Sequence, residues 1–330
     1  MRYIALEECF SIPGLPALSV AGPREGQGAA LQSPVSPDFM ESVGRRLPDF
    51  TDYRLPEMDE AGVDIQVLSH TVPGVQQDME AGRAVEAARA ANDYLAEVIN
   101  QHPARFAGLA ALPLQDPNAA VAELVRAVGQ LGMRGGLVNN YFGGHFLDEP
   151  QYDVLWAALE SLRVPLYLHP GVPATEPWAV LDGYPMLADA MWGWAATTGG
   201  HAMRIVCGGV FDRHPDATLI LGHMGEFLPF QVSRFDSRYA TFKLDRPLLR
   251  KPSAYFGSNV LITTSGVFDP VVLRSAIDIL GADAVMFAVD YPWEASRDAV
   301  ELVRRTAMTD AERHLVAHGN AERLLKLEGE

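Results

Sequence analysis

The sequence predicts an α/β protein built as one (β/α)8 TIM barrel, and three observations support that prediction. Eight short apolar runs recur along the 330 residues, with helical stretches between most of them. The runs are almost continuously hydrophobic, as strands buried on both faces should be. No GxGxxG pattern follows the first run, which disfavours an open, doubly wound nucleotide-binding sheet. Eight strands that alternate with helices are typical of a closed barrel.

The eight runs are the predicted strands. In chain order they cover residues 3–6, 64–69, 106–112, 134–139, 164–169, 217–223, 259–264 and 284–290. Between them, Asp116-Pro117 and Asp269-Pro270 each offer a helix N-cap followed by a proline in the first turn. Thr309 and Glu312 have the spacing of a capping box, which predicts the start of the last helical region.

Residues 11–52 interrupt the alternation of strands and helices. The first part of this stretch is rich in glycine, proline and serine, so we predict a long loop after the first strand. Its role stays open between a surface loop and a cover over the pocket, because barrel enzymes place their sites at that end of the strands. No linker or break in composition divides the chain, and we expect one domain over residues 1–330.

Composition argues against several classes of protein. With 26 basic and 42 acidic residues the formal charge is −16, which disfavours a nucleic-acid partner. No apolar run reaches the ~18 residues of a membrane span, and charged residues near the start interrupt any signal peptide. The chain has two cysteines, Cys9 and Cys207. So few cysteines indicate a reducing compartment, and we predict a cytoplasmic protein in which Cys207 is a small buried residue.

Acidic, thiol and imidazole side chains follow four of the predicted strands at one end of the barrel. They are Glu7, Glu8, Cys9, His169, His223 and Asp290. Converging carboxylates repel one another and resist burial, so a divalent cation is the simplest counter-charge. Because side chains two apart share a face of a strand, Glu7 and Cys9 should point together and Glu8 oppositely. Parity alone leaves open which face is the inward one.

Six longer segments carry a family resemblance: ALEECF (5–10), ALPLQDP (111–117), LYLHP (166–170), LGHMGEFLPF (221–230), ITTSGVF (262–268) and FAVDYPWE (287–294). In this order they resemble the metal-dependent decarboxylase branch of the amidohydrolase superfamily, which contains γ-resorcylate, 2,3-dihydroxybenzoate and salicylate decarboxylases. The combination is specific for the family and much less so for the substrate.

The resemblance implies a metal site. Glu7, His169 and Asp290 match positions of the family's metal ligands. Cys9 stands where members often have a ligating histidine and in some cases a non-coordinating residue such as alanine. We expect one divalent ion, with Zn²⁺ favoured because a thiolate suits zinc, and Mn²⁺ or Mg²⁺ as alternatives. Coordination by Cys9 and an inert, alanine-like role both stay open.

The resemblance also implies the reaction, which is nonoxidative decarboxylation of a hydroxylated aromatic acid. A proton must reach the ring carbon that bears the carboxylate, and we assign its donor to Asp290. His223, held by Glu226, is predicted to orient a substrate hydroxyl. Arg234 and Asn139 match substrate-contacting positions of the family. A surface ion pair remains an alternative for Arg234, and a structural role remains one for Asn139.

Two other functions compete with this one. A hydrolase or hydratase of the same superfamily would use the metal to activate water, and an inactive relative would only bind metal. The intact site residues and the MGEFLP and ITTSG segments favour the decarboxylase. The expected partners are a small aromatic carboxylate and further copies of the chain, as a homodimer or homotetramer. For His70, which follows the second run, a structural role is favoured over contact with substrate.

Overall fold

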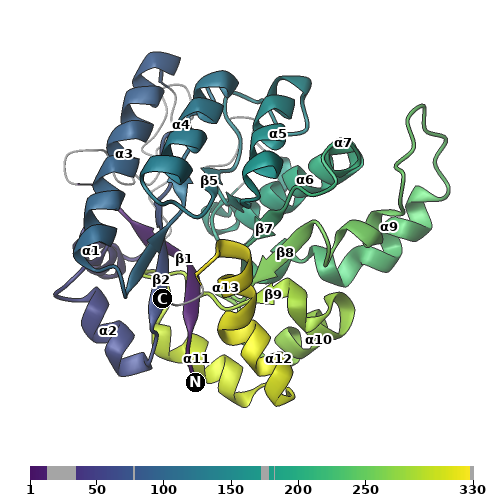
Figure 1. Cartoon of the computed structure of the whole chain (residues 1–330). Helices are drawn as coiled ribbons and strands as arrows, with labels where there is room; N and C mark the ends of the chain where they lie inside the picture. The colour runs from purple at the N-terminus through teal and green to yellow at the C-terminus, as the bar shows by residue number, and fades with distance from the viewer. Residues whose placement is uncertain (13–34, 77–78, 172–177, 182, 328–330) are drawn as a thin grey trace.

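The computed structural model describes residues 1–12, 35–76, 79–171, 178–181 and 183–327, and it has the predicted barrel architecture (Figure 1). Strands surround a central axis and helices lie outside them. The strands form two hydrogen-bonded sheets with the orders β1-β2-β3 and β4-β5-β6-β7-β8-β9. Leu6 N donates to Phe287 O (3.1 Å), which joins β1 to the chain after β9 and closes the barrel. Ala110 N donates to Gly135 O (2.9 Å), which joins β4 to the residue before β5.

Each of the eight predicted runs overlaps a strand. The strands are β1 (Ile4–Phe10), β2 (Ile65–His70), β3 (Phe106–Gly108), β4 (Ala110–Ala111), β5 (Gly136–Asn139), β6 (Leu166–His169), β7 (Leu219–Leu221), β8 (Val260–Thr263) and β9 (Val285–Met286). The third run is divided between β3 and β4. β1 is longer than predicted, because Cys9 and Phe10 pair with Ser69 and His70 of β2. The last run is only partly extended, so Asp290 lies four residues beyond β9.

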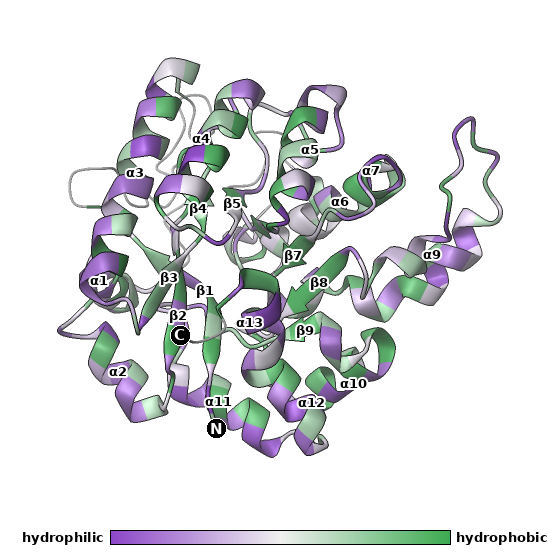
Figure 2. Cartoon of the chain, in the orientation of Figure 1, coloured by the Kyte–Doolittle hydropathy of each residue, from purple (hydrophilic) through white to green (hydrophobic). Residues whose placement is uncertain are grey.

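The helices present apolar residues to the barrel and polar residues to the outside (Figure 2). They are α1 (Pro37–Arg46), α2 (Arg54–Ala61), α3 (Ala81–Gln101), α4 (Pro117–Gln130), α5 (Asp153–Leu162), α6 (Gly193–Cys207), α7 (Val210–Arg213), α8 (His223–Glu226), α9 (Val232–Tyr239), α10 (Pro270–Leu280), α11 (Ser296–Arg305), α12 (Asp310–His314) and α13 (Asn320–Leu325). The predicted N-caps are present at Asp116 and Asp269, whose side chains accept from backbone amides. The capping box of Thr309 and Glu312 is present too.

The barrel interior is filled by side chains from β1, β2, β3 and β5 to β9, and by Leu109 between β3 and β4. Buried residues of this inner cluster include Leu6, Val67, Ala107, Leu109, Leu137, Tyr167, Ile220, Leu261, Met286 and Ala288. Ala321 and Leu325 of α13 belong to the same cluster, so this C-terminal helix covers the amino end of the barrel. A separate, larger cluster packs the outer faces of the strands against the helices. With the amino end sealed in this way, the carboxyl end is left for the site.

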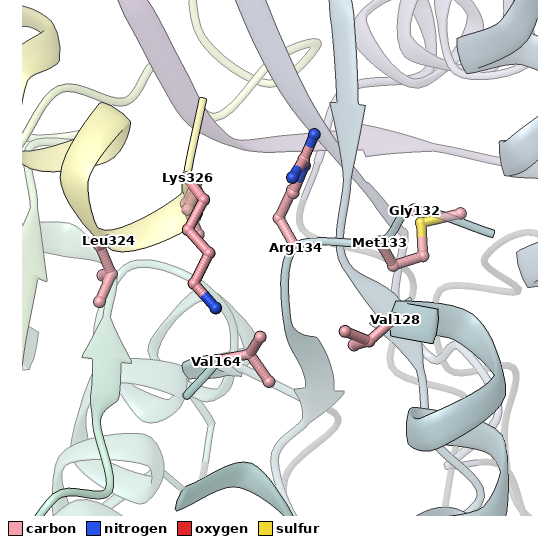
Figure 3. Close-up of a pocket in the computed structure, with 8 residues that line it drawn as sticks. Val128, Gly132, Met133, Arg134, Val164, Leu324 and Lys326 are labelled. Carbon is pink, nitrogen blue, oxygen red and sulfur yellow. The ribbon is translucent and has the colours of Figure 1, made fainter. Parts of the chain in front are cut away.

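A small cavity of about 80 Å³ lies at the amino end (Figure 3). Its lining comes from the ends of α4 and α13 and from the residues before β5 and β6, which include Arg134, Val164 and Lys326. None of the predicted site residues lines it. The cavity is therefore on the face opposite the predicted chemistry.

Two predictions about the chain need correction. The stretch 11–52 is not all loop, since residues 37–46 form α1 and Phe39 N donates to the N-cap Ser36. Residues 13–34 lie outside the described residues. Cys207 was predicted to be buried but is exposed, because it is the last residue of α6. No helix among the described residues is long and apolar enough to cross a membrane.

Candidate metal centre and active site

Glu7 points into the barrel because β1 contains an irregularity. Leu6 already packs in the barrel interior, so regular alternation would turn Glu7 outward. The register of β1 against β2 shifts between Ala5 and Glu8, and Glu7 has a φ of +68°. A bulge of this kind re-aims the side chain that it carries. Both Leu6 and Glu7 therefore face the axis, which parity could not predict.

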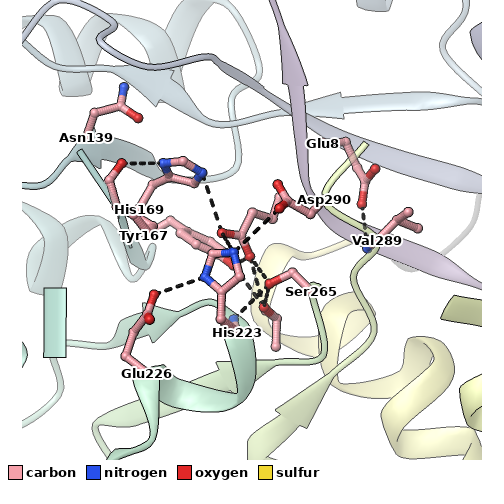
Figure 4. A network of polar contacts seen from close by, with 12 residues as sticks. Glu8, Asn139, Tyr167, His169, His223, Glu226, Ser265, Val289 and Asp290 are labelled. Atoms are coloured by element: carbon pink, nitrogen blue, oxygen red, sulfur yellow. Dashed lines mark hydrogen bonds and ion pairs between the residues drawn. The ribbon is translucent and has the colours of Figure 1, made fainter. Parts of the chain in front are cut away.

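Three hydroxyl groups hold one oxygen of Glu7. Tyr167, Thr263 and Ser265 all donate to Oε2, and the bond from Thr263 is 3.3 Å long (Figure 4). Gly222 leaves room for the carboxylate, since a Cβ there would lie 2.5 Å from both oxygens. The second oxygen, Oε1, is buried and has no hydrogen-bond partner in the described part of the chain. This geometry fixes the carboxylate and directs a free acceptor into the site.

His169 ends β6 with a ring nitrogen directed at Glu7. Its Nδ1 lies 2.6 Å from the carbonyl oxygen of Pro170, which can only accept, so Nδ1 carries the proton. Nε2 then has a free lone pair and lies 3.6 Å from Glu7 Oε1. Burial lowers the pKa of His169, so the ring is neutral. A neutral imidazole whose other nitrogen donates to a backbone carbonyl is the usual state of a metal-ligating histidine.

His223 lies among three carboxylates. Its Nδ1 is 3.0 Å from Glu226 Oε1, which is the predicted contact, and its Nε2 is 3.5 Å from Asp290 Oδ2 and 3.8 Å from Glu7 Oε1. Burial alone would lower the pKa of His223. The charges of Glu7 and Glu226 and the hydrogen bonds to Asp290 and Glu226 outweigh burial and raise that pKa well above its ordinary value. The imidazole can therefore carry a proton where the carboxylates meet.

A left-handed turn carries this histidine. The residues from His223 to Phe227 all have positive φ angles between 49° and 73°, although only Gly225 is a glycine. A left-handed conformation costs roughly 1–2 kcal/mol for each of the four residues that are not glycine. Gly225 N donates to Gly222 O (2.7 Å), which closes the turn. Backbone strain of this extent is typical of functional sites, where the surrounding structure maintains it.

The four predicted ligands and His223 form two overlapping groups that share Asp290. In the first group, ligand atoms of Cys9, His169 and Asp290 all lie within 4.8 Å of one another; the second group is Glu7, His223 and Asp290. Asp290 Oδ1 is buried and without a hydrogen-bond partner, like Glu7 Oε1. Unsatisfied carboxylate oxygens beside a neutral imidazole fit a divalent cation, which would supply the missing contacts. The donor set thus suits the predicted metal.

Cys9 is part of the site wall. It is 1% exposed, and Val43 and Leu47, from α1 and the residue after it, pack on it together with Trp293. Burial and the neighbouring carboxylates raise the pKa of the Cys9 thiol well above its ordinary value. In the absence of a cation the side chain is therefore a neutral thiol. The contact with Val43 and Leu47 places α1 and the residue after it against Cys9, while the role of the loop within residues 11–52 stays a prediction.

Three other predicted residues lie in different surroundings. Asn139, the last residue of β5, is paired with His169 in the sheet and has a buried Oδ1 without a hydrogen-bond partner. Arg234 is exposed on α9, which projects from the barrel (Figure 1), and no described residue forms an ion pair with it. His70 faces the helices rather than the axis, with its ring 5.7 Å from that of Phe10. The structural role favoured for His70 agrees with this packing.

Sequence reasoning missed the residues that support the ligands. Tyr167 precedes His169 by two positions, so alternation along β6 could have placed its hydroxyl in the barrel. Thr263 and Ser265 have the same spacing at the end of β8. His201 is buried, and its Nδ1 lies 2.9 Å from Asn140 Oδ1. No sequence signal separates such a structural histidine from a ligand.

The chain matches the amidohydrolase family over residues 19–327. The γ-resorcylate decarboxylase of Rhizobium sp. (strain MTP-10005) is 41% identical, with coverage of 99% of this chain and 98% of that protein. A solved structure of 2,6-dihydroxybenzoate decarboxylase complexed with 2,6-dihydroxybenzoate has a TM-score of 0.90 and 39% identity, over 99% of both chains. The dihydroxybenzoic acid decarboxylase of Polaromonas sp. JS666, solved with manganese and 2-nitroresorcinol, has a TM-score of 0.89 and 36% identity, over 99% of this chain and 98% of that one. This chain therefore belongs to the amidohydrolase family, in its decarboxylase branch.

Proposed function

We propose that this protein removes the carboxylate of 2,6-dihydroxybenzoate (γ-resorcylate) or a close analogue. The chain is a carboxy-lyase that acts on a hydroxylated aromatic acid without an oxidant. The observation that carries the assignment is the set of unsatisfied carboxylate oxygens around His169 and His223, in a chain 41% identical to a γ-resorcylate decarboxylase over nearly its whole length. The ring pattern of the substrate is the finer, proposed part.

The geometry of the site supports the proposed roles. A divalent metal at this site would hold the substrate carboxylate and the adjacent ring oxygen, and would favour the electron-rich phenolate. Asp290 delivers a proton to the ring carbon that loses the carboxylate. Its Oδ2 lies 3.5 Å from His223 Nε2, so the imidazole can return a proton to it. Glu226 fixes the imidazole through Nδ1. Carbon dioxide leaves as the ring regains its aromaticity.

The proposed ligands are Glu7, His169, Asp290 and Cys9, with Zn²⁺ favoured over Mn²⁺ and Mg²⁺. The thiol lies within 4.8 Å of ligand atoms of His169 and Asp290, and a thiolate selects softer ions. The manganese in the Polaromonas structure supports a divalent ion at such a site and leaves its identity in this chain to experiment.

Cobalt substitution tests the role of Cys9 directly. A thiolate ligand gives Co²⁺ a charge-transfer absorption in the near ultraviolet, and we expect this band in the native chain but not in Cys9→Ala. Cys207→Ala is the matched control, since that thiol is exposed on α6 and should leave the band unchanged. If the native chain and Cys9→Ala give the same spectrum and the same preference for zinc over manganese, Cys9 is not a ligand.

A panel of hydroxybenzoates tests the function. We expect release of carbon dioxide from 2,6-dihydroxybenzoate at a higher kcat/KM than from its 2,3-isomer or salicylate. In D₂O the resorcinol formed should carry one deuterium at the carbon that lost the carboxylate. Water addition or hydrolysis without carbon dioxide would favour the hydratase or hydrolase alternative instead.

Arg234→Ala is expected mainly to raise KM, because binding shared by ground and transition states would be lost.

The homo-oligomer and the cytoplasmic location are also proposals. Exposed apolar side chains on and near α9 support self-association, and they include Phe227, Phe230, Phe242, Leu244 and Leu249. A dimer or tetramer is expected in sedimentation at micromolar concentration, and a particle with the mass of one chain would contradict it. Two free cysteines support a reducing compartment.

A further inference from the structure

Glu8 is fully buried beside the predicted ligand Glu7 but has different contacts. Its Oε1 accepts a hydrogen bond from Val289 N (2.9 Å), and its Oε2 accepts one from Tyr291 N (3.2 Å). Figure 4 shows Glu8 directed at the chain beside Asp290, away from the imidazoles. Both oxygens of Glu8 are therefore used by the two backbone amides that flank Asp290.

Asp290 needs such support because its backbone is unusual. Its φ is +82°, which is unfavourable for a residue with a side chain. β9 ends at Met286, so regular strand pairing does not hold this turn. Besides the two bonds to Glu8, Tyr291 O accepts from Cys9 N at 2.8 Å. Three hydrogen bonds thus tie the turn to β1, the strand that carries Glu7.

We propose that Glu8 is a positioning residue, which holds the turn around Asp290 so that its carboxylate meets Glu7 and His223. The need for a carboxylate follows from the contacts. Glutamine has one acceptor oxygen, so its amide nitrogen would face the second backbone N–H without a bond. Aspartate keeps both oxygens but is one methylene shorter. The kinetic part of this inference rests on the proposed function.

Arg54 adds further contacts to β1 and to the turn around Asp290. The arginine is fully buried on α2, and its Nη2 donates to Cys9 O (2.6 Å). Its guanidinium carbon lies 4.2 Å from the centre of the Tyr291 ring. Burial raises the pKa of Glu8 well above its ordinary value, although the Val289 amide and the charge of Arg54 oppose that shift. A buried network in which both oxygens of Glu8 accept hydrogen bonds is rigid, as a positioning role requires.

The test compares Glu8→Gln with Glu123→Gln. Glu123 is the matched control, because it is equally buried and bonded to Arg126 and Asn92, but it lies on α4 in the helix layer. In Glu8→Gln we expect kcat to fall about 10²-fold, as for a reacting group misplaced by ~1 Å. KM should change by less than about threefold. The dissociation constant for Mn²⁺, measured by chelator competition, should rise about tenfold. Glu123→Gln should lower Tm while leaving kcat and the Mn²⁺ constant unchanged.

Two results would overturn the inference. One is a metal-loaded Glu8→Gln whose kcat and Mn²⁺ affinity both equal those of the native chain. The other is an equal loss in Glu123→Gln, which would assign the effect to general destabilisation. If Glu8→Gln does not fold, Glu8→Asp takes its place, with the same split between kcat and KM expected and an unchanged kcat contradicting the role. If the native chain decarboxylates nothing, the proposed function fails, while the Mn²⁺ constants still decide the role of Glu8.

Discussion

Buried carboxylates at the carboxyl end of the barrel and the buried amide of Asn320 at its amino end differ in their hydrogen bonding. At the carboxyl end, Glu7 Oε1, Asp290 Oδ1 and Glu226 Oε2 are buried without a hydrogen-bond partner. At the amino end, Asn320 is just as buried, but its Nδ2 donates to Ala282 O (2.7 Å) and Val285 O (2.8 Å). Unsatisfied buried groups are expensive, so they persist where a ligand completes them.

Backbone conformation differs between the two ends in the same way. Non-glycine residues with positive φ gather at the carboxyl end, namely Glu7, Asn140, His223, Met224, Glu226, Phe227 and Asp290. At the amino end such residues are helix C-caps, Arg163 and Lys326, where a left-handed residue is ordinary. This chain therefore has strained backbone where the chemistry is predicted and regular packing where only stability is needed.

The largest effect should come from Asp290→Asn. Asparagine is nearly isosteric and can still offer an oxygen to a metal, but it cannot donate the ring proton. At matched metal content we expect kcat to fall by roughly 10³-fold or more. Near-normal kcat in metal-loaded Asp290→Asn would move the proton donor to another group, with His223 the next to test.

His223→Asn should retain metal and lose roughly 10²-fold in kcat.

Gly222→Ala should weaken metal binding without touching a ligand. The new Cβ would lie 2.5 Å from both oxygens of Glu7, so the carboxylate must move away from its three hydroxyl donors. Disturbing the support of a ligand typically costs about 10–100-fold in metal affinity, measurable by chelator competition. Gly200→Ala is the control, since a Cβ there on α6 meets nothing within 4 Å. Equal affinities in the two variants would refute the tight packing around Glu7.

Asn320→Ala tests the amino end. Ala282 O and Val285 O would lose their donor there, and we expect a loss of about 1–3 kcal/mol in the free energy of unfolding. Denaturant titration measures that loss. Because the change is at the end of the barrel opposite the site, kcat and metal affinity should stay unchanged. A fall in kcat at full metal content would show that the two ends are coupled rather than separate.

The smallest effect is the pH dependence of stability contributed by His70. Burial lowers the pKa of this histidine to about 4 in the folded chain. Between about pH 6.5 and 4 the unfolded chain binds a proton there that the folded chain does not, so the free energy of unfolding falls as pH falls. His70→Leu should remove about 1–3 kcal/mol of that decline between pH 7 and 4.5. If the stability curves of the native chain and the variant run parallel over this range, His70 is not held neutral.

Much of the fold is readable in the sequence, because parallel strands buried on both faces leave continuous apolar runs and Asp-Pro pairs mark helix starts. The clustering of Glu7, Cys9, His169, His223 and Asp290 at the ends of these runs could be predicted for the same reason. The inward orientation of Glu7 could not be predicted, because it depends on a register shift in β1 for which the sequence carries no signal. The left-handed turn from His223 to Phe227 is equally hidden, because it contains a single glycine. The predicted burial of Cys207 was wrong, because an apolar sequence context does not ensure that a residue is buried.

Metal titration of the purified, metal-stripped chain tests most directly whether the decarboxylation depends on one bound divalent ion. Carbon dioxide and resorcinol formed from 2,6-dihydroxybenzoate would be measured while Zn²⁺ or Mn²⁺ is added back. We expect equal amounts of carbon dioxide and resorcinol, and a rate that rises in proportion to metal occupancy and levels off at about one ion per chain. Decarboxylation at full rate in the metal-free chain, or one bound ion per chain with no carbon dioxide from any hydroxybenzoate, would contradict this expectation.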